Sequence, residues 1–257
     1  MPSNRDPHDW VEQHFAAMGS HAHVALRGTA DDMRWAQREI ERLEYRWSAA
    51  YGCSDVARCN RAAGRSEVAV AGETIELLDA AIAWWRATDG WFDPTALDAA
   101  PAPGCADIVV DHATNSVFLP HGVGIDLGGI GKGAAADRVV AGLAARGVVA
   151  ACVSLGGDVR TYGSGHDGAI VTSTSGRRHE VLCERRNHLV DPNTGQAADT
   201  GLAAVVVTDH STERAEVLSK AAFVAGRERG ADLLARFGVD GWFLPTGTAA
   251  SLSLPRG

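Results

Sequence analysis

Cysteine is scarce in this sequence, and it is not arranged for cross-linking or for metal binding. The five cysteines among the 257 residues form an odd, scattered set without a CxxC pair: Cys53, Cys59, Cys105, Cys152 and Cys183. A disulfide framework needs paired cysteines, and a zinc site of cysteines needs closely spaced ones. We therefore expect reduced thiols.

The sequence also has no excess of basic over acidic residues and no long apolar run. The formal net charge at pH 7 is -8, whereas a general nucleic-acid binder needs a basic surface that replaces phosphate counterions. No apolar run has the length of a bilayer-spanning helix, and residues 1–10 show neither the basic nor the apolar region of an export signal. We expect a cytoplasmic protein that binds no nucleic acid and does not insert into membranes.

The residues that are present suffice for a hydrophobic core, because 46% of them are hydrophobic and 22% are charged. Apolar residues at helical spacing predict four amphipathic helices, over about 29–47, 75–88, 132–147 and 211–226. Thr29 and Asp32 predict a capping box at the start of the first helix, and Asp89-Gly90 predicts the end of the second.

Short strand-like runs lie between these helices, at 23–26, 108–110, 117–119, 151–155, 169–172 and 203–208. They do not alternate one by one with the helices, which favours an α+β fold with mixed or antiparallel sheets over a doubly wound parallel sheet. We expect a single domain over 1–257, with two intimate subdomains of about 1–104 and 105–257 as the alternative. We also expect a flexible N-terminus over 1–14 and a linker or long loop at 99–104.

Two glycine-rich segments could bind anions. Residues 124–133 (GIDLGGIGKG) predict a strand that runs into a glycine-rich turn and then into the third helix, and residues 154–158 (SLGGD) end a second strand. Backbone amides of such turns can approach phosphate oxygens. The first segment is neither a Walker loop nor a GxGxxG fingerprint, and a plain strand-to-helix turn would explain it equally well.

Two further segments carry polar groups at informative positions. His188 precedes a turn at Asp191-Pro192, which could hold the imidazole in one orientation, as a general base requires; a surface histidine beside a loop is the simpler interpretation. Glu216 and Lys220 are four residues apart on one helical face, where a surface ion pair is the simpler interpretation.

The order of segments resembles that of the ApbE family, the FAD:protein FMN transferases, across nearly the whole chain. The matching segments are 18–20 (family MGT), 54–60 (SELSxLN), 88–94 (TDGxFDP), 126–133 (DLGGIAKG), 154–158 (NLGGD), 172–176 (TSG) and 188–195 (HIIDPxTG). The resemblance implies an ApbE-like, T-fold-like architecture. It also implies that FMN from FAD is attached to a Thr or Ser of an acceptor protein, with AMP released and Mg²⁺ bound.

The resemblance also implies roles for individual residues. Catalytic roles fall to His188 as the base, Lys132 near the phosphates, and Asp191 in the same segment as the histidine. The residues expected to contact FAD are Met18, Asn60, Asp89, Phe92, Asp93, Asp126, Gly128, Gly129, Gly156, Gly157, Asp158 and Thr172. The carbonyl of Gly131, with Glu216 and Ser219, would bind the metal.

The chain departs from the family at two places. Glu216 and Lys220 stand where the family segment ADALATA has its magnesium-binding Asp and Thr, and a lysine ammonium has no lone pair for a metal. The connection between Gly163 and Val171 is shorter than the family's strand pair. These departures leave three alternatives open: an FAD-binding protein without transfer activity, a metal-dependent FAD pyrophosphatase, and an inactive scaffold.

Overall fold

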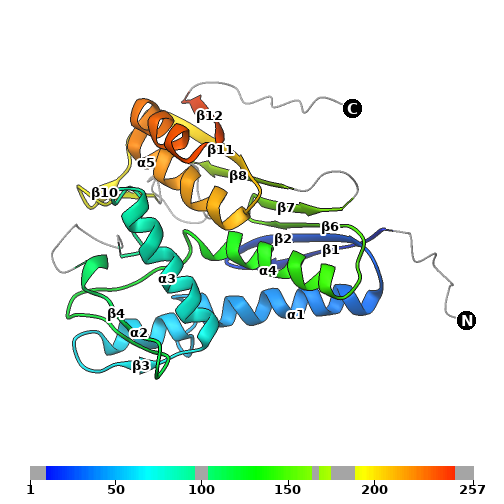
Figure 1. Cartoon of the computed structure of the whole chain (residues 1–257), viewed down its shortest axis with the longest axis horizontal. Helices are drawn as coiled ribbons and strands as arrows, with labels where there is room; N and C mark the ends of the chain where they lie inside the picture. The colour runs from blue at the N-terminus through cyan, green and yellow to red at the C-terminus, as the bar shows by residue number, and fades with distance from the viewer. Residues whose placement is uncertain (1–9, 96–103, 164–167, 175–188, 247–257) are drawn as a thin grey trace, which may run out of the picture.

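The structure is a computed structural model that describes residues 10–95, 104–163, 168–174 and 189–246, without the side chains of 169–174. A seven-stranded antiparallel sheet is its largest element, in the order β1-β2-β6-β7-β8-β11-β12 (Figure 1). Its strands are β1 (Trp10–Ala17), β2 (Ser20–Arg27), β6 (Ala151–Leu155), β7 (Asp158–Tyr162), β8 (Gly168–Thr174), β11 (Leu202–Asp209) and β12 (Asp240–Pro245). The expected α+β class with antiparallel sheets is confirmed.

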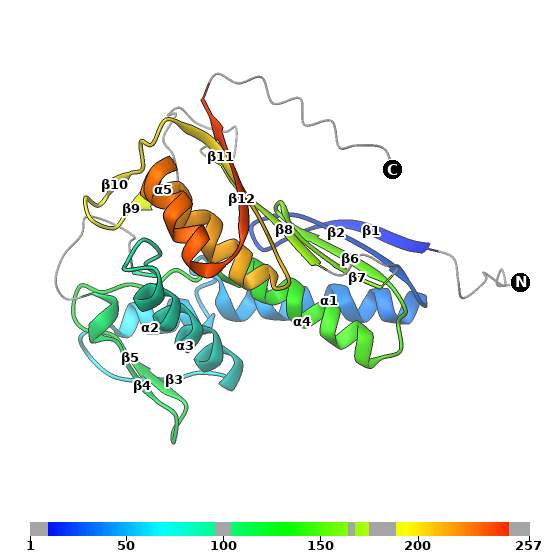
Figure 2. The ribbon, with the colours of Figure 1, turned by 45° about the horizontal axis from the view of Figure 1, so that its top comes forward.

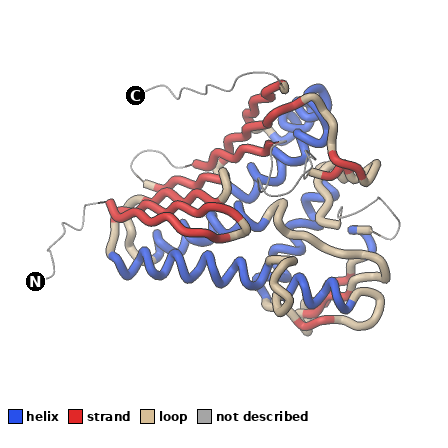
Figure 3. Tube along the Cα trace, turned by 180° about the vertical axis from the view of Figure 1, so that it is seen from behind, coloured by secondary structure: helices blue, strands red, loops and turns tan. Residues whose placement is uncertain are grey.

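Three long helices cover one face of this sheet: α1 (Ala30–Trp47), α4 (Gly131–Ala145) and α5 (Thr212–Phe237). Viewed from behind, the other face of the sheet lies in front of these helices, and no helix of the described residues covers it (Figure 3). The main core fills the space between the helices and the sheet, around fully buried residues such as Leu26, Ile40 and Leu155.

A smaller lobe lies beside one end of the helical layer (Figure 2). It contains α2 (Asp55–Ala62), α3 (Gly72–Ala87), a 3-10 turn at Cys105–Asp107 and a three-stranded sheet of β3 (Val68–Ala69), β5 (Ser116–Phe118) and β4 (Val109–Asp111). A two-stranded hairpin of β9 (Val190–Asp191) and β10 (Gln196–Ala197) lies near α5.

The helix predictions hold at most boundaries. Thr29 and Asp32 form the predicted capping box, with the Asp32 amide donating to Thr29 Oγ1 over 3.2 Å. The last helix is longer than expected, because the chain bends at Gly226, where φ is 80° and ψ is 175°, and then continues as helix to Phe237. Gly226, which the sequence analysis took as the end of this helix, produces a kink within it.

Two expectations need correction. Residues 10–14, expected to be flexible, belong to β1, whose alternating exposed and half-buried residues pair with β2 across a turn at Met18-Gly19. Residues 124–127, expected as a strand before α4, lie in no sheet of the described residues. The expected linker at 99–104 lies almost wholly outside the described residues.

The described cysteines are free thiols: Cys53, Cys59, Cys105 and Cys152. Burial raises the pKa of Cys59 to about 11 and that of Cys105 to about 12, so both remain neutral thiols well above pH 8. We expect iodoacetamide at pH 8 to alkylate the exposed Cys53 in the folded protein, while Cys59 and Cys105 react only after denaturation. Peptide mass spectrometry measures this order, and equal labelling rates before denaturation would contradict it.

Candidate active site

The glycine-rich turn before α4 is held in place from two sides. The side chain of Asn60 on α2 bonds both backbone groups of Ile125: Nδ2 donates to the Ile125 carbonyl over 2.9 Å, and Oδ1 accepts from the Ile125 amide over 2.8 Å. The Asp126 amide donates to the Pro94 carbonyl over 2.8 Å. Ile125 and Leu127 are buried, whereas Asp126 is exposed. The extended segment therefore obtains from a side chain the pairing that a neighbouring strand would supply.

This arrangement makes a test of Asn60 possible. In Asn60→Asp the carboxylate still accepts from the Ile125 amide but cannot donate to the Ile125 carbonyl, which leaves a buried acceptor facing a negative charge. We expect the free energy of unfolding to fall by about 1–3 kcal/mol, measured by urea denaturation. Asn115→Asp, at an exposed turn with φ of 50°, is the matched control; an equal loss in both variants would contradict this role of Asn60.

Four charged side chains meet beneath the turn, from three elements. Lys132 at the start of α4 forms ion pairs with Asp158 of β7, with Nζ and Oδ2 2.7 Å apart, and with Glu216 of α5. Lys220, one turn further along α5, pairs with Glu216 Oε1 over 2.6 Å. Glu216 Oε2 accepts from the amide of Gly133 over 2.7 Å. The two positive and two negative charges of this buried cluster therefore cancel.

Burial and pairing act against each other in this cluster. Burial raises the pKa of Glu216, but Lys132 and Lys220 outweigh it and hold that pKa below its ordinary value. Burial lowers the pKa of Lys132, but Glu216 and Asp158 outweigh it and raise that pKa. Burial is stronger at the other two groups, so that the pKa of Asp158 is raised and that of Lys220 is lowered.

Close packing of α4 against α5 brings these groups together. A Cβ atom on Gly133 would lie 2.4 Å from the carbonyl oxygen of Thr212, so only glycine fits at this crossing. Asp137 of α4 accepts from the amides of Thr212 and Glu213, over 3.0 and 3.1 Å, and so caps the start of α5. Figure 1 shows the two helices side by side over the sheet.

Two pockets open on either side of the turn. The larger one, of about 350 Å³, reaches Lys132 and is lined by Met18, Trp47, Tyr51 and Gly128 among others. The smaller one, of about 110 Å³, reaches Lys220 and is lined by Phe92, Asp93, Gly129 and Val190 among others. Asp126 lines both pockets, so a ligand that fills both would cross the turn with its middle part beside the two lysines.

The structure gathers most of the predicted ligand-binding residues here. Those that line a pocket are Met18, Phe92, Asp93, Asp126, Gly128, Gly129, Gly131 and Lys132. Gly156 and Gly157 form the tight β6–β7 turn with φ of 61° and 97°, and a Cβ on Gly156 would lie 3.5 Å from Lys132 Cδ. The turn therefore brings most of these residues together, and their roles in ligand binding stay predictions.

Other predicted residues have different surroundings. Asn60 lines neither pocket and anchors Ile125, and Asp89 is an exposed residue that forms an ion pair with Arg236, with Oδ2 and Nη1 2.6 Å apart. Asp191 Oδ1 accepts from the amide of Asn193 over 2.9 Å within the β9–β10 turn. The hydroxyl of Ser219 donates to the Glu216 carbonyl over 3.0 Å.

Two of the predicted site residues lie wholly or partly outside the described residues. His188 is not among the described residues. The backbone of Thr172 pairs with Val206 in the sheet, and its side chain is one of those not described.

The sequence analysis did not single out Tyr51, an aromatic residue of the larger pocket that is 47% exposed. Trp47 belongs to the main core and also lines this pocket. Tyr51 lies three residues before the motif at 54–60, and an exposed aromatic residue close to a motif is the signal that could have identified it.

Comparisons with known proteins show the family of this chain. The ApbE family model matches residues 18–169 and 164–243. The FAD:protein FMN transferase of Klebsiella pneumoniae (strain 342) is 29% identical over 248 residues, which cover 79% of this chain and 78% of that protein. The FAD:protein FMN transferase of Treponema pallidum (strain Nichols) is 29% identical over 270 residues, covering 80% and 74%.

Solved structures share the fold. The ApbE protein of Thermotoga maritima superposes with a TM-score of 0.81 at 26% identity, covering 93% of this chain and 95% of that one. The flavin transferase ApbE from Vibrio cholerae gives a TM-score of 0.77 at 20% identity, covering 91% and 93%. Because the Vibrio cholerae protein is only 20% identical to this chain, its likeness shows the fold alone.

Proposed function

Because the chain belongs to the ApbE family, we propose that it is an FAD:protein FMN transferase. The observation that carries the proposal is the pair of pockets on either side of the glycine turn, with Lys132 reaching one and Lys220 the other. A dinucleotide such as FAD has two bulky ends joined by a pyrophosphate, which matches two pockets on either side of a turn that has two lysines beside it. The acceptor would be a protein with a Thr or Ser target.

FAD would cross the turn with its pyrophosphate over residues 128–132. The helix dipole at the start of α4 favours an anion, while the amides of Gly128, Gly131 and Gly133 already donate to Asp126, Leu127 and Glu216. Lys132 Nζ lies 3.4 Å from the Gly128 carbonyl, directly beneath the turn. The smaller pocket, with Phe92 and Asp93, would take the adenosine end. The larger pocket, with Trp47 and Tyr51, has an aromatic lining and room for the flavin ring.

The transfer step follows from this placement. The hydroxyl oxygen of the acceptor forms a bond to the FMN phosphorus, the bond from that phosphorus to the bridging oxygen breaks, and AMP leaves with that oxygen. In-line transfer depends above all on positioning and on neutralising phosphate charge. We assign the hydroxyl proton to His188 as general base, with the turn at Asp191 fixing the segment that carries it.

The magnesium implied by the family does not fit the side chains as they are arranged. Glu216 has both oxygens engaged, by Lys132, Lys220 and the Gly133 amide. Lys220 occupies the position of the family's threonine ligand and can only donate. Among the described residues, Gly131, Glu216 and Ser219 therefore do not form an open ligand set, so the Mg²⁺ that the resemblance implies has no part in the proposed mechanism. The lysine ammonium groups would supply the positive charge.

The shortened connection after Gly163 does not interrupt the sheet. β7 and β8 are direct antiparallel neighbours, with Asp158 opposite Val171 and Thr161 opposite Gly168. The sheet is therefore continuous at Asp158 despite the short connection. This continuity favours an active transferase over an inactive scaffold.

No helix in the described part of the chain combines the length and the apolar character needed to cross a bilayer. The cytoplasmic location stays a prediction from the sequence.

The proposal is tested with purified protein, FAD and an acceptor domain that carries the target threonine. We expect release of AMP together with an increase in the mass of the acceptor by one FMN group. AMP release without modification of the acceptor would identify an FAD pyrophosphatase. FAD binding without either product would identify a binding protein, and absence of FAD binding would overturn the proposal.

A further inference from the structure

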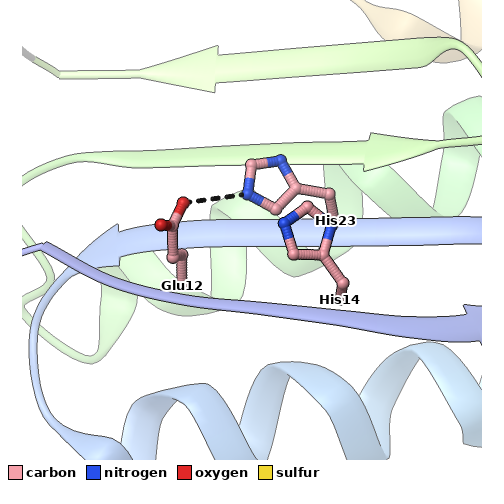
Figure 4. A group of neighbouring side chains, drawn as sticks. All are labelled: Glu12, His14 and His23. Atoms are coloured by element: carbon pink, nitrogen blue, oxygen red, sulfur yellow. Dashed lines mark hydrogen bonds and ion pairs between the residues drawn. The ribbon is translucent and has the colours of Figure 1, made fainter.

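The uncovered face of the large sheet carries a cluster of histidines at the β1–β2 hairpin, away from the four charged side chains beneath the glycine turn. His14 of β1 lies directly opposite His23 of β2 in the register of the hairpin. Glu12, two residues before His14, projects from the same face because side chains alternate along a strand. Figure 4 shows the three side chains turned toward one another above the two strands.

The distances in this cluster are short enough for a shared ligand. One ligand atom from each of Glu12, His14 and His23 lies within 4.8 Å of the other two. Glu12 Oε2 and His23 Nε2 are 3.4 Å apart, and the rings of His14 and His23 stack with centroids 4.2 Å apart and an interplanar angle of 9°. Within the part of the chain that the structure describes, no other group of three such residues converges in this way.

We propose that Glu12, His14 and His23 form a binding site for a zinc ion. Two imidazoles and one carboxylate are a ligand set suited to zinc, with a water molecule as the fourth ligand. Zinc ligands lie about 2.0–2.2 Å from the ion, so rotations of the side chains must bring the three atoms closer together. Glu12 and His14 are exposed and His23 is half-buried, which leaves them free to rotate.

Strand pairing fixes the positions of the two histidines relative to each other. The pairing of β1 with β2 fixes His14 opposite His23, and β6 on the other side of β2 fixes His23 opposite Ser154. The ligands thus stand on a rigid sheet, and the ion would have to order only their side chains. The ring of His21 lies 5.2 Å from that of His14 and provides a further imidazole near the ion.

Glu12, His14 and His23 line neither of the two pockets beside the glycine turn. A hard cation such as magnesium prefers oxygen ligands, so the histidine-rich cluster would discriminate against it.

Isothermal titration of the tag-free, EDTA-treated protein with zinc chloride tests the proposal. We expect one equivalent of zinc to bind per chain. His14→Ala and His23→Ala should each weaken binding at least tenfold, which corresponds to about 1.4 kcal/mol, and Glu12→Gln should weaken it as well. His112→Ala is the matched control, because His112 is an exposed histidine of the smaller lobe beside Asp79.

Absence of one-equivalent binding at tens of micromolar protein would overturn the proposal. Zinc binding that His14→Ala and His23→Ala leave unchanged would overturn it too. Circular dichroism of each variant checks that the overall secondary structure is retained, and a cobalt-substituted sample with the visible spectrum of a four-coordinate ion would support the expected geometry.

Discussion

Replacing Glu216 by alanine should lower the free energy of unfolding by about 3–5 kcal/mol, because it leaves two buried ammonium groups without their shared partner. Glu216 is fully buried and contacts Lys132, Lys220 and the Gly133 amide. Its removal exposes Lys132 and Lys220 to mutual repulsion at the junction of α4 and α5. Urea denaturation followed by circular dichroism measures the change.

Glu228→Ala is the matched control, since Glu228 is an exposed glutamate on the same helix. Exposed substitutions of this kind change stability by about 0.5 kcal/mol or less. A double variant, Glu216→Ala with Lys220→Met, should recover part of the loss because one of the unpaired charges is gone. A loss in Glu216→Ala no larger than that in Glu228→Ala would show that the ion pairs contribute little.

His188→Ala should lower the rate of FMN transfer about 100-fold or more, in line with the usual contribution of a general base. FAD binding should persist, because the pockets beside the glycine turn are lined by other residues. The measurement is the rate of mass gain by the acceptor at saturating FAD, combined with a binding titration from flavin fluorescence.

His112→Ala, which changes an exposed histidine far along the chain from the motif, is the control and should transfer FMN at the rate of the unmodified protein. An unchanged rate in His188→Ala would remove this histidine from the mechanism. Loss of FAD binding in His188→Ala would instead make it a binding residue.

Local patterns predicted much of the fold. The capping box at Thr29 and the strand at 151–155 are in the structure at the predicted residues, because a helix cap and a buried strand depend on neighbours within a few positions. β1, β7 and β12 were missed, since their exposed or half-buried residues give a weak apolar signal. Their pairing with distant strands stabilises them.

Part of the arrangement around the glycine turn was predictable. The motif at 126–133 predicted a turn that leads into a helix, and α4 begins at Gly131, but no local pattern shows that Asn60 pairs with Ile125, 65 residues away. The four-residue spacing of Glu216 and Lys220 suggested a surface ion pair. The close approach of α4 to α5 at Gly133, which places that pair in the interior, depends on tertiary packing.

The most direct test of the account is the transfer of FMN to the acceptor in buffer with EDTA, compared with the same reaction in magnesium. With Lys132 and Lys220 as the cations beside the pyrophosphate, we predict that mass gain of the acceptor proceeds in EDTA at a rate within about twofold of that in magnesium, a difference of less than about 0.5 kcal/mol. Lys220→Thr, which restores the family residue, is the matched control and should become dependent on magnesium. Transfer by the unmodified protein only when magnesium is present would contradict the account of the lysines, and no transfer under either condition would contradict the function itself.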